Sequence, residues 1–129
     1  MYKPDGHSDV SPYLVVADAQ ATLDFLAAAF GAVPGLVHHR PDGTIMHAEA
    51  RLGDTIVMMG QMAGGPAAHV HVYVADPEAV FARALDAGGT VAQALTLRDD
   101  GDRRGGVTDP TGTTWWIART ERARHDAPP

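Results

Sequence analysis

The sequence predicts a single α+β domain, with two βαβββ modules forming a curled mixed β-sheet cleft and the helices outside. Residues 14–18 (LVVAD) match residues 72–76 (VYVAD) at an offset of 58 positions, from Asp18 to Asp76. The same offset of 58 relates Met58 to Trp116, so the copies also agree near their ends. A chain of 129 residues is long enough for one hydrophobic core and too short for two independent ones. Both modules therefore belong to one domain.

The first module is expected over about residues 9–62. Asp18 follows an apolar strand and is a natural N-cap, after which apolar residues recur at helical spacing as far as Phe30. Gly31 comes next, and glycine is the residue that a left-handed helix C-cap prefers. A meander of about three strands is expected to complete the module, with a tight turn at residues 52–54 (LGD).

The second module is expected over about residues 67–119 and repeats this order. Asp76 is its helix N-cap, and residues 109–112 (DPTG) form the turn before its last strand. Residues 63–66 (AGGP) have the composition of a turn or linker and mark the joint between the modules. Residues 120–129 are expected to be a flexible tail.

Composition excludes several classes of protein and of site. The formal net charge of −6 disfavours nucleic acid and anionic membrane surfaces as partners, because both require a concentrated basic face. The chain has no cysteine, which excludes a disulfide scaffold, a thiolate nucleophile and cysteine metal ligands. No apolar run reaches the length of a signal peptide or a membrane span, so a cytoplasmic location is expected.

Side-chain alternation places polar residues of two strands on the face opposite the helices. They are His47, Glu49 and Arg51 on the strand at residues 45–52, and His69, His71 and Tyr73 on the strand at residues 68–74. Two interpretations remain open at this point. The face is either a ligand cleft, as in many helix-backed sheets, or the ordinary polar side of a solvent-facing antiparallel sheet.

The repeat and its motifs together resemble the vicinal oxygen chelate superfamily, which includes glyoxalase I, extradiol dioxygenases and the fosfomycin- and bleomycin-resistance proteins. The resemblance covers about residues 9–118 and is closer to the PhnB-like, glyoxalase-related branch. The motifs that carry it are the opening strand at residues 13–18 (YLVVAD), Phe30-Gly31-Ala32, His47-Ala48-Glu49, Asp109-Pro110-Thr111-Gly112 and Trp115-Trp116, with the loop Gly101-Asp102-Arg103. It implies the fold described above and a homodimer.

The resemblance also implies where a metal would bind. Superfamily members that hold a metal use one residue from each of four strands, which carries over here to Ser11, Glu49, His69 and Trp116. His69 and Glu49 are suitable ligands, Ser11 is a poor one, and the Trp116 indole nitrogen can only donate a hydrogen bond. Catalytic metal sites have at least three protein ligands, so no cofactor is expected. A divalent metal (Zn, Ni, Fe or Mn) held by His69 and Glu49 remains the alternative.

Glu49 and His69 each have further interpretations. Glu49 is expected to pair with Arg51 or His47, and the alternative is an improvised metal site with His47 and His71. His69 is a metal ligand, a proton acceptor in the cleft or a hydrogen-bonded structural histidine. Four other histidines lie in termini or turns and carry no functional signal: His7, His38, His39 and His125.

Aromatic residues are the remaining candidates for ligand contact. Trp115 is expected in the core, whereas Trp116 offers a flat stacking surface in the cleft. The residues expected to line the same space are Tyr13, Ile56, Met58 and Tyr73. The loop at residues 98–106 is expected to be a hydrated turn, with Arg103 or Arg104 holding an anionic ligand at the cleft mouth as the alternative.

Two functions follow from these residues. The first is non-catalytic sequestration of a planar or aromatic small molecule, of the bleomycin-resistance type, which requires only a shaped cleft. The second is a metal-dependent glyoxalase-type lyase, isomerase or dioxygenase, in which Glu49 moves a proton. Position 116 separates them, because the resemblance associates the enzymes with Glu where this chain has Trp.

Overall fold

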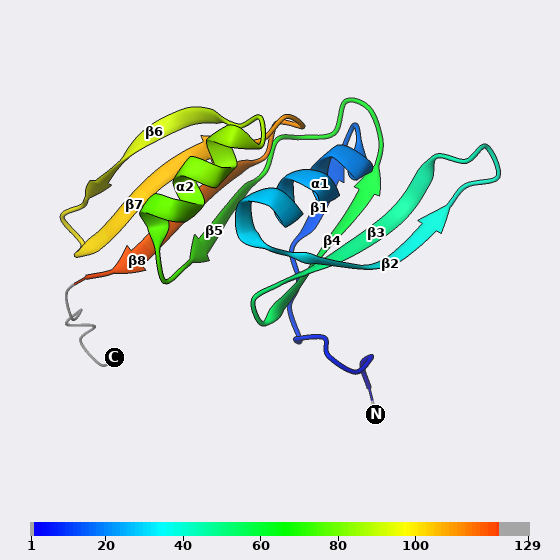
Figure 1. Ribbon diagram of the computed structural model, residues 1–129. Coiled ribbons are helices and arrows are strands. Elements are labelled where there is room, and N and C mark those ends of the chain that lie inside the picture. The colour runs from blue at the N-terminus through cyan, green and yellow to red at the C-terminus, as the bar shows by residue number, and fades with distance from the viewer. Residues whose placement is uncertain (1, 122–129) are drawn as a thin grey trace.

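The computed structural model describes residues 2–121 and contains the two predicted modules (Figure 1). Module 1 consists of β1 (Tyr13–Val16), α1 (Ala19–Phe30), β2 (Val33–His39), β3 (Ile45–Leu52) and β4 (Thr55–Gln61). Module 2 consists of β5 (His69–Tyr73), α2 (Pro77–Asp86), β6 (Thr90–Leu97), β7 (Asp102–Thr108) and β8 (Thr114–Thr120). The predicted βαβββ order is confirmed in both.

Each module forms its own four-stranded mixed sheet. Sheet 1 has the order β1-β4-β3-β2 and sheet 2 the order β5-β8-β7-β6. In each, the first and last strands of the module pair in parallel, with Tyr13 opposite Met58 and His71 opposite Trp116. Tyr13 and His71 are 58 positions apart, and so are Met58 and Trp116, which is the offset that relates the two copies in the sequence. The repeat therefore extends to the strand register.

The helices begin and end where the sequence predicts. The Asp18 carboxylate accepts a hydrogen bond from the backbone N–H of Ala21, and that of Asp76 accepts one from Ala79. Gly31 ends α1 with φ of 69°, a left-handed conformation that glycine adopts without steric cost. These caps fix both helices along their sheets.

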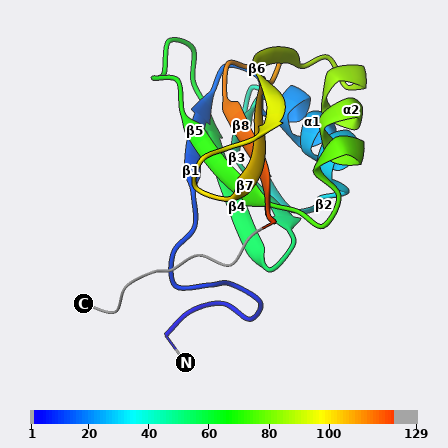
Figure 2. The same ribbon diagram turned by 90° about the vertical axis from the view of Figure 1, so that its left-hand side faces the viewer.

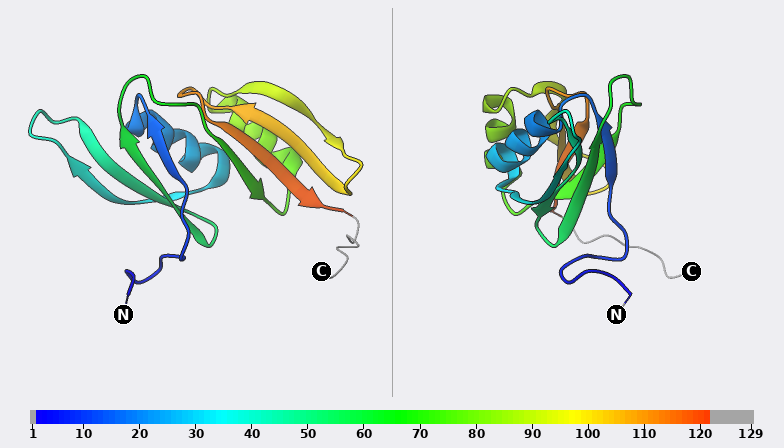
Figure 3. Two further views of the ribbon diagram at one scale, coloured as in Figure 1. Left: turned by 180° about the vertical axis from the view of Figure 1, so that it is seen from behind. Right: turned by 90° about the vertical axis from the view of Figure 1, so that its right-hand side faces the viewer.

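Both helices lie on the same side of the two sheets, so the molecule has a helical layer and a sheet layer (Figures 2 and 3). The core lies between the layers. Trp115 on β8 is fully buried there, as predicted, and its ring lies 5.5 Å from that of Phe30 on α1. The Trp115 indole N–H donates to Asp109 at 2.9 Å, so the DPTG turn anchors the largest core side chain.

Contacts of α1 with α2 and with the β7–β8 turn join the modules. Arg83 on α2 donates to the carbonyl oxygen of Ala29 on α1 at 3.3 Å, and the hydroxyls of Thr22 and Thr111 lie 3.0 Å apart. The predicted joint at residues 63–66 falls in the loop between β4 and β5. The modules therefore share one core.

The predicted hydrated turn at residues 98–106 is wrong in extent, because β7 begins at Asp102. Apart from Thr120, the end of β8, and Glu121, the predicted tail lies outside the described residues, as does His125. Neither helix of the described chain is long and apolar enough to cross a membrane.

Candidate functional site

The face of each sheet that points away from the helices is called here its polar face. On sheet 1 this face carries a cluster of two histidines and a carboxylate. Glu49 on β3 is 8% exposed, and its two carboxylate oxygens accept separate hydrogen bonds, from His47 at 2.8 Å and from His7 at 3.0 Å. The Tyr13 ring stacks on His47 with 5.7 Å between centroids. Of the two expected partners of Glu49, His47 is therefore confirmed.

Arg51 does not pair with Glu49. Its guanidinium donates instead to the carbonyl oxygen of Gly6 at 2.7 Å. Residues 2–9, called here the N-terminal strap, thus lie on the polar face of sheet 1, held by His7 and by this bond. The expectation that His7 carries no signal was wrong. Nothing in the local sequence indicates this contact, because 42 positions separate His7 from Glu49.

The environment of Glu49 keeps its carboxylate charged. Burial by itself raises the pKa of Glu49, but the hydrogen bonds and positive potential from His47 and His7 outweigh it. The pKa of Glu49 is therefore lowered below its ordinary value. At neutral pH the cluster consists of an ionised carboxylate held between two imidazoles.

On sheet 2, Trp116 forms a flat aromatic platform. The indole lies across β7 at Gly106, where a Cβ atom would come within 2.8 Å of its Cζ3. The Trp116 indole N–H donates to His69 Nδ1 at 3.0 Å, and the two rings are nearly parallel (16°) with 6.1 Å between centroids, so His69 lies at the edge of the indole. Gly106 lies beneath the ring and His69 lies at its edge. Together they hold the Trp116 ring flat on the polar face of sheet 2.

A second buried carboxylate, that of Asp102, accepts hydrogen bonds from several side chains on the polar face of sheet 2. Asp102 is fully buried and accepts hydrogen bonds from the Tyr73 hydroxyl at 2.7 Å and from Thr120 at 3.0 Å. His71 packs against Tyr73 with 4.7 Å between ring centroids. The predicted grouping of His69, His71 and Tyr73 on one face is therefore confirmed. Asp102 was missed as a site residue because it was assigned to a turn.

The placement of Arg103 at the cleft mouth was wrong. Arg103 points to the helix side of β7 and pairs with Glu78 of α2. Arg104, one residue on, lies on the polar face and bonds Asp100 and Asp102 at 3.0 and 3.4 Å. Alternation along β7 explains the difference, since neighbouring strand residues point to opposite faces.

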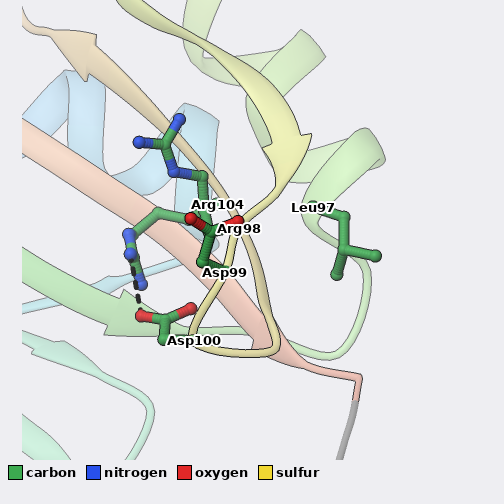
Figure 4. Close-up of a pocket in the computed structure, with 5 residues that line it drawn as sticks. All are labelled: Leu97, Arg98, Asp99, Asp100 and Arg104. Atoms are coloured by element: carbon green, nitrogen blue, oxygen red, sulfur yellow. Dashed lines mark hydrogen bonds and ion pairs between the residues drawn. The ribbon is translucent and has the colours of Figure 1, made fainter.

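Figure 4 shows the pocket that Arg104 lines near the turn between β6 and β7. It has a volume of about 430 Å³ and is also lined by Arg98 and Asp99. The Arg104 side chain points to Asp100, so its charge is already matched within the chain. The pairing of Arg104 with Asp100 therefore weakens the alternative in which Arg104 holds an anionic ligand.

Comparison with known proteins identifies the family. The family model described as the Glyoxalase/Bleomycin resistance protein/Dioxygenase superfamily matches residues 10–117. The chain belongs to this superfamily. TioX from Micromonospora sp. ML1 matches with a TM-score of 0.75 at 30% identity, covering 88% of this chain and 98% of that one.

Two further relatives have the same overall extent. A glyoxalase/bleomycin resistance protein from Catenulispora acidiphila has a TM-score of 0.64 at 20% identity, covering 85% of this chain and 96% of that one, which supports the fold alone. An uncharacterized protein of Mycobacterium bovis is 39% identical over 132 residues, covering 88% of this chain and 84% of that protein. The superfamily fold thus accounts for both sheets and both helices.

The strand register corrects one position carried over from the superfamily. Trp116 lies opposite His71 on β5, and the equivalent residue opposite Tyr13 on β1 is Met58 on β4, not Glu49 on β3. Glu49 lies one strand further along the sheet, opposite Met58. By the 58-residue repeat, the counterparts of His69 and Trp116 in module 1 are therefore Ser11 and Met58.

These residues do not fit a metal ion. Trp116 cannot ligate, Met58 offers a weakly binding thioether, and the Nδ1 atom of His69 already accepts the indole N–H. Within residues 2–121, no group of three or more His, Cys, Asp and Glu side chains is arranged to hold a metal ion. The improvised combination of Glu49, His47 and His71 is not brought together, because His71 is on sheet 2.

Cavities adjoin both polar faces. One of about 410 Å³ lies beneath the N-terminal strap, and its lining includes Pro4, His7 and Arg51. Another of about 380 Å³ lies between the modules and is lined by His71 and Tyr73 with residues of the β3–β4 turn. Tyr13 and Trp116 each contact a histidine of their own sheet, and neither of them lines these two cavities.

The lowered pKa of Glu49 predicts an acid-sensitive contribution to stability. Because the folded-state pKa is below the unfolded one, the charged carboxylate stabilises the fold above the ordinary pKa of about 4.3 and loses this effect as pH falls. Glu49→Gln should lower the free energy of unfolding by about 1–3 kcal/mol at neutral pH. The difference from wild type should shrink toward about pH 4.

Urea unfolding of both proteins across this pH range measures that difference. Glu78→Gln is the control, because Glu78 is exposed in its pair with Arg103 and should change stability by at most about 1 kcal/mol. If the effect of Glu49→Gln on the free energy of unfolding does not change with pH, the conclusion that folding lowers the pKa of Glu49 is wrong.

Proposed function

We propose that this superfamily member binds a planar or aromatic small molecule on its polar face and does not transform it. The observation that carries the proposal is the Trp116 platform. An indole held flat over Gly106, with its N–H occupied by His69, presents an apolar ring face with no polar group that a ligand would have to satisfy. Planar organic molecules stack on such a surface.

The name of the superfamily includes both binding proteins and enzymes. Membership therefore does not decide between binding and catalysis, and the proposal rests on the residues of the site. A metal-dependent lyase, isomerase or dioxygenase requires ligands that positions 11, 58 and 116 do not offer. Glu49, the proposed proton carrier, has both oxygens bonded to imidazoles. These residues support binding over catalysis. Placement in the PhnB-like branch stays a prediction.

The binding proposal predicts that Trp116 is required for affinity. Trp116→Ala should weaken binding of naphthalenemethanol, a planar neutral probe, by about tenfold or more, because it removes the stacking surface. Isothermal titration calorimetry measures the affinity, and circular dichroism checks the fold. Val91→Ala, at an exposed residue whose pairing with Val107 puts it on the helix side of sheet 2, is the control and should bind as wild type does. Unchanged affinity in Trp116→Ala would refute the stacking role.

We also propose that the site works without a bound metal. Elemental analysis of protein purified without chelator should find far less than one equivalent of Zn, Ni, Fe or Mn. Added divalent ions should leave the unfolding midpoint unchanged, because a ligand that binds only the native state must raise it. Near one equivalent of metal, lost on His69→Ala or Glu49→Ala, would overturn the proposal.

A homodimer is proposed as the functional form. The outer strands β2 and β6 are exposed along most of their length, and Tyr73 and Val91 are each more than half exposed. Exposed strand edges and apolar side chains of this kind favour pairing with another chain. Size-exclusion chromatography with light scattering at micromolar concentration should give about twice the 13.6 kDa chain mass, and a monomer would contradict the dimer.

A further inference from the structure

The N-terminal strap lies outside the residues that the family model matches, because that match begins at residue 10. The strap nevertheless contacts the polar face through two side-chain hydrogen bonds that reach β3, from His7 to Glu49 and from Arg51 to the Gly6 carbonyl. A backbone hydrogen bond from His7 N–H to the Pro4 carbonyl at 3.3 Å gives the strap a turn at this point.

Two strap residues, Pro4 and His7, form part of the wall of an open pocket. The 410 Å³ pocket has Pro4 and His7 on one side, Val33 and Leu36 of β2 on another, and Arg51 and Ile56 at its base. Its walls are mostly apolar, and its polar groups are gathered where the strap meets β3. A pocket of this size and composition suits a small molecule with one apolar body and one polar end.

Two hydrogen-bonding groups at this pocket are not used within the described chain. His7 Nδ1 is buried and has no hydrogen-bond partner there. Arg51 has five N–H donors, and its one side-chain hydrogen bond within residues 2–121 uses Nη2. Because His7 Nε2 donates to Glu49, His7 Nδ1 can donate to a carboxylate only when the ring is protonated at both nitrogens, whereas the unused Arg51 donors are available in either state.

The charges indicate what the polar end should be. Both oxygens of Glu49 are already bonded to imidazole N–H groups, which leaves the Arg51 guanidinium as the ion with unused donors. A guanidinium matches the planar fork of a carboxylate better than any other common anion except phosphate. The pocket therefore favours a carboxylate joined to an apolar ring.

We propose that the pocket beside the strap binds a small aromatic carboxylate. Arg51 receives the carboxylate, the ring lies against Val33, Leu36 and Ile56, and the strap forms the outer wall through His7. The inference rests on the proposed function, that the polar face binds a planar molecule, and adds the chemical class and a contribution from outside the residues that the family model matches.

Naphthoate titrated into isotopically labelled full-length protein tests the proposal by nuclear magnetic resonance. Amide shifts should change at residues 4–7, 33–36 and 49–51. Arg51→Gln should weaken binding roughly tenfold or more, and His7→Ala should weaken it several-fold. Two matched controls, Arg98→Gln at the β6–β7 turn and His39→Ala on exposed β2, should bind as wild type does.

The outcomes separate this inference from the proposed function. If naphthalenemethanol, the same ring without the carboxylate, shifts the amides at residues 4–7, 33–36 and 49–51 at concentrations as low as naphthoate does, the carboxylate pocket is wrong and the binding function stands. The same conclusion follows if Trp116→Ala loses naphthoate while Arg51→Gln keeps it. Tighter binding after deletion of residues 2–8 would make the strap a plug and overturn its role as a wall. Failure of both probes to bind wild type would overturn both proposals.

Discussion

The fold depends on the burial of Trp115 where the modules meet. This side chain belongs to module 2, yet it packs against Phe30 at the end of α1 in module 1. Asp109 accepts its indole N–H, and the other oxygen of the same carboxylate accepts backbone N–H groups of the turn. A buried indole without this acceptor would leave an unpaired donor in the core, at a cost of about 1–3 kcal/mol. One carboxylate thus fixes both a turn and the largest core residue.

Placing both helices on one side of the sheets determines where chemistry can occur. The helices cover one side of both sheets (Figures 2 and 3). Because side chains alternate along a strand, His47 and Glu49 of β3, His69 and His71 of β5 and Trp116 of β8 lie on the opposite face. Gly105 and Gly106 show the consequence at adjacent positions of β7. A Cβ at Gly105 would meet Phe81 of α2, whereas one at Gly106 would meet Trp116 on the polar side. Each glycine admits an aromatic ring to its own side of the sheet.

Sequence patterns predicted the features that depend on local spacing. The 58-residue repeat, the Asp18 and Asp76 caps, and the opposite environments of Trp115 and Trp116 follow from periodicity alone. Arg103 was misassigned because its segment was interpreted as a turn, where alternation does not apply. The contact of His7 with Glu49 was beyond prediction, since it joins a segment without periodic pattern to a strand far along the chain. The position of Glu49 relative to Trp116 likewise required the strand register.

That register shows how two copies of one module have come to carry different chemistry. Glu49 lies opposite Met58 in sheet 1, and at the equivalent place in sheet 2 Gly106 lies opposite Trp116. Module 1 therefore has a carboxylate beside a thioether, and module 2 has a bare backbone beneath an indole. A carboxylate at position 106 could not coexist with the flat Trp116 ring, because even a Cβ there would approach it within 2.8 Å. Within one module, the flat indole and a carboxylate on the neighbouring strand therefore compete for the same space, and in this chain each occupies its own module.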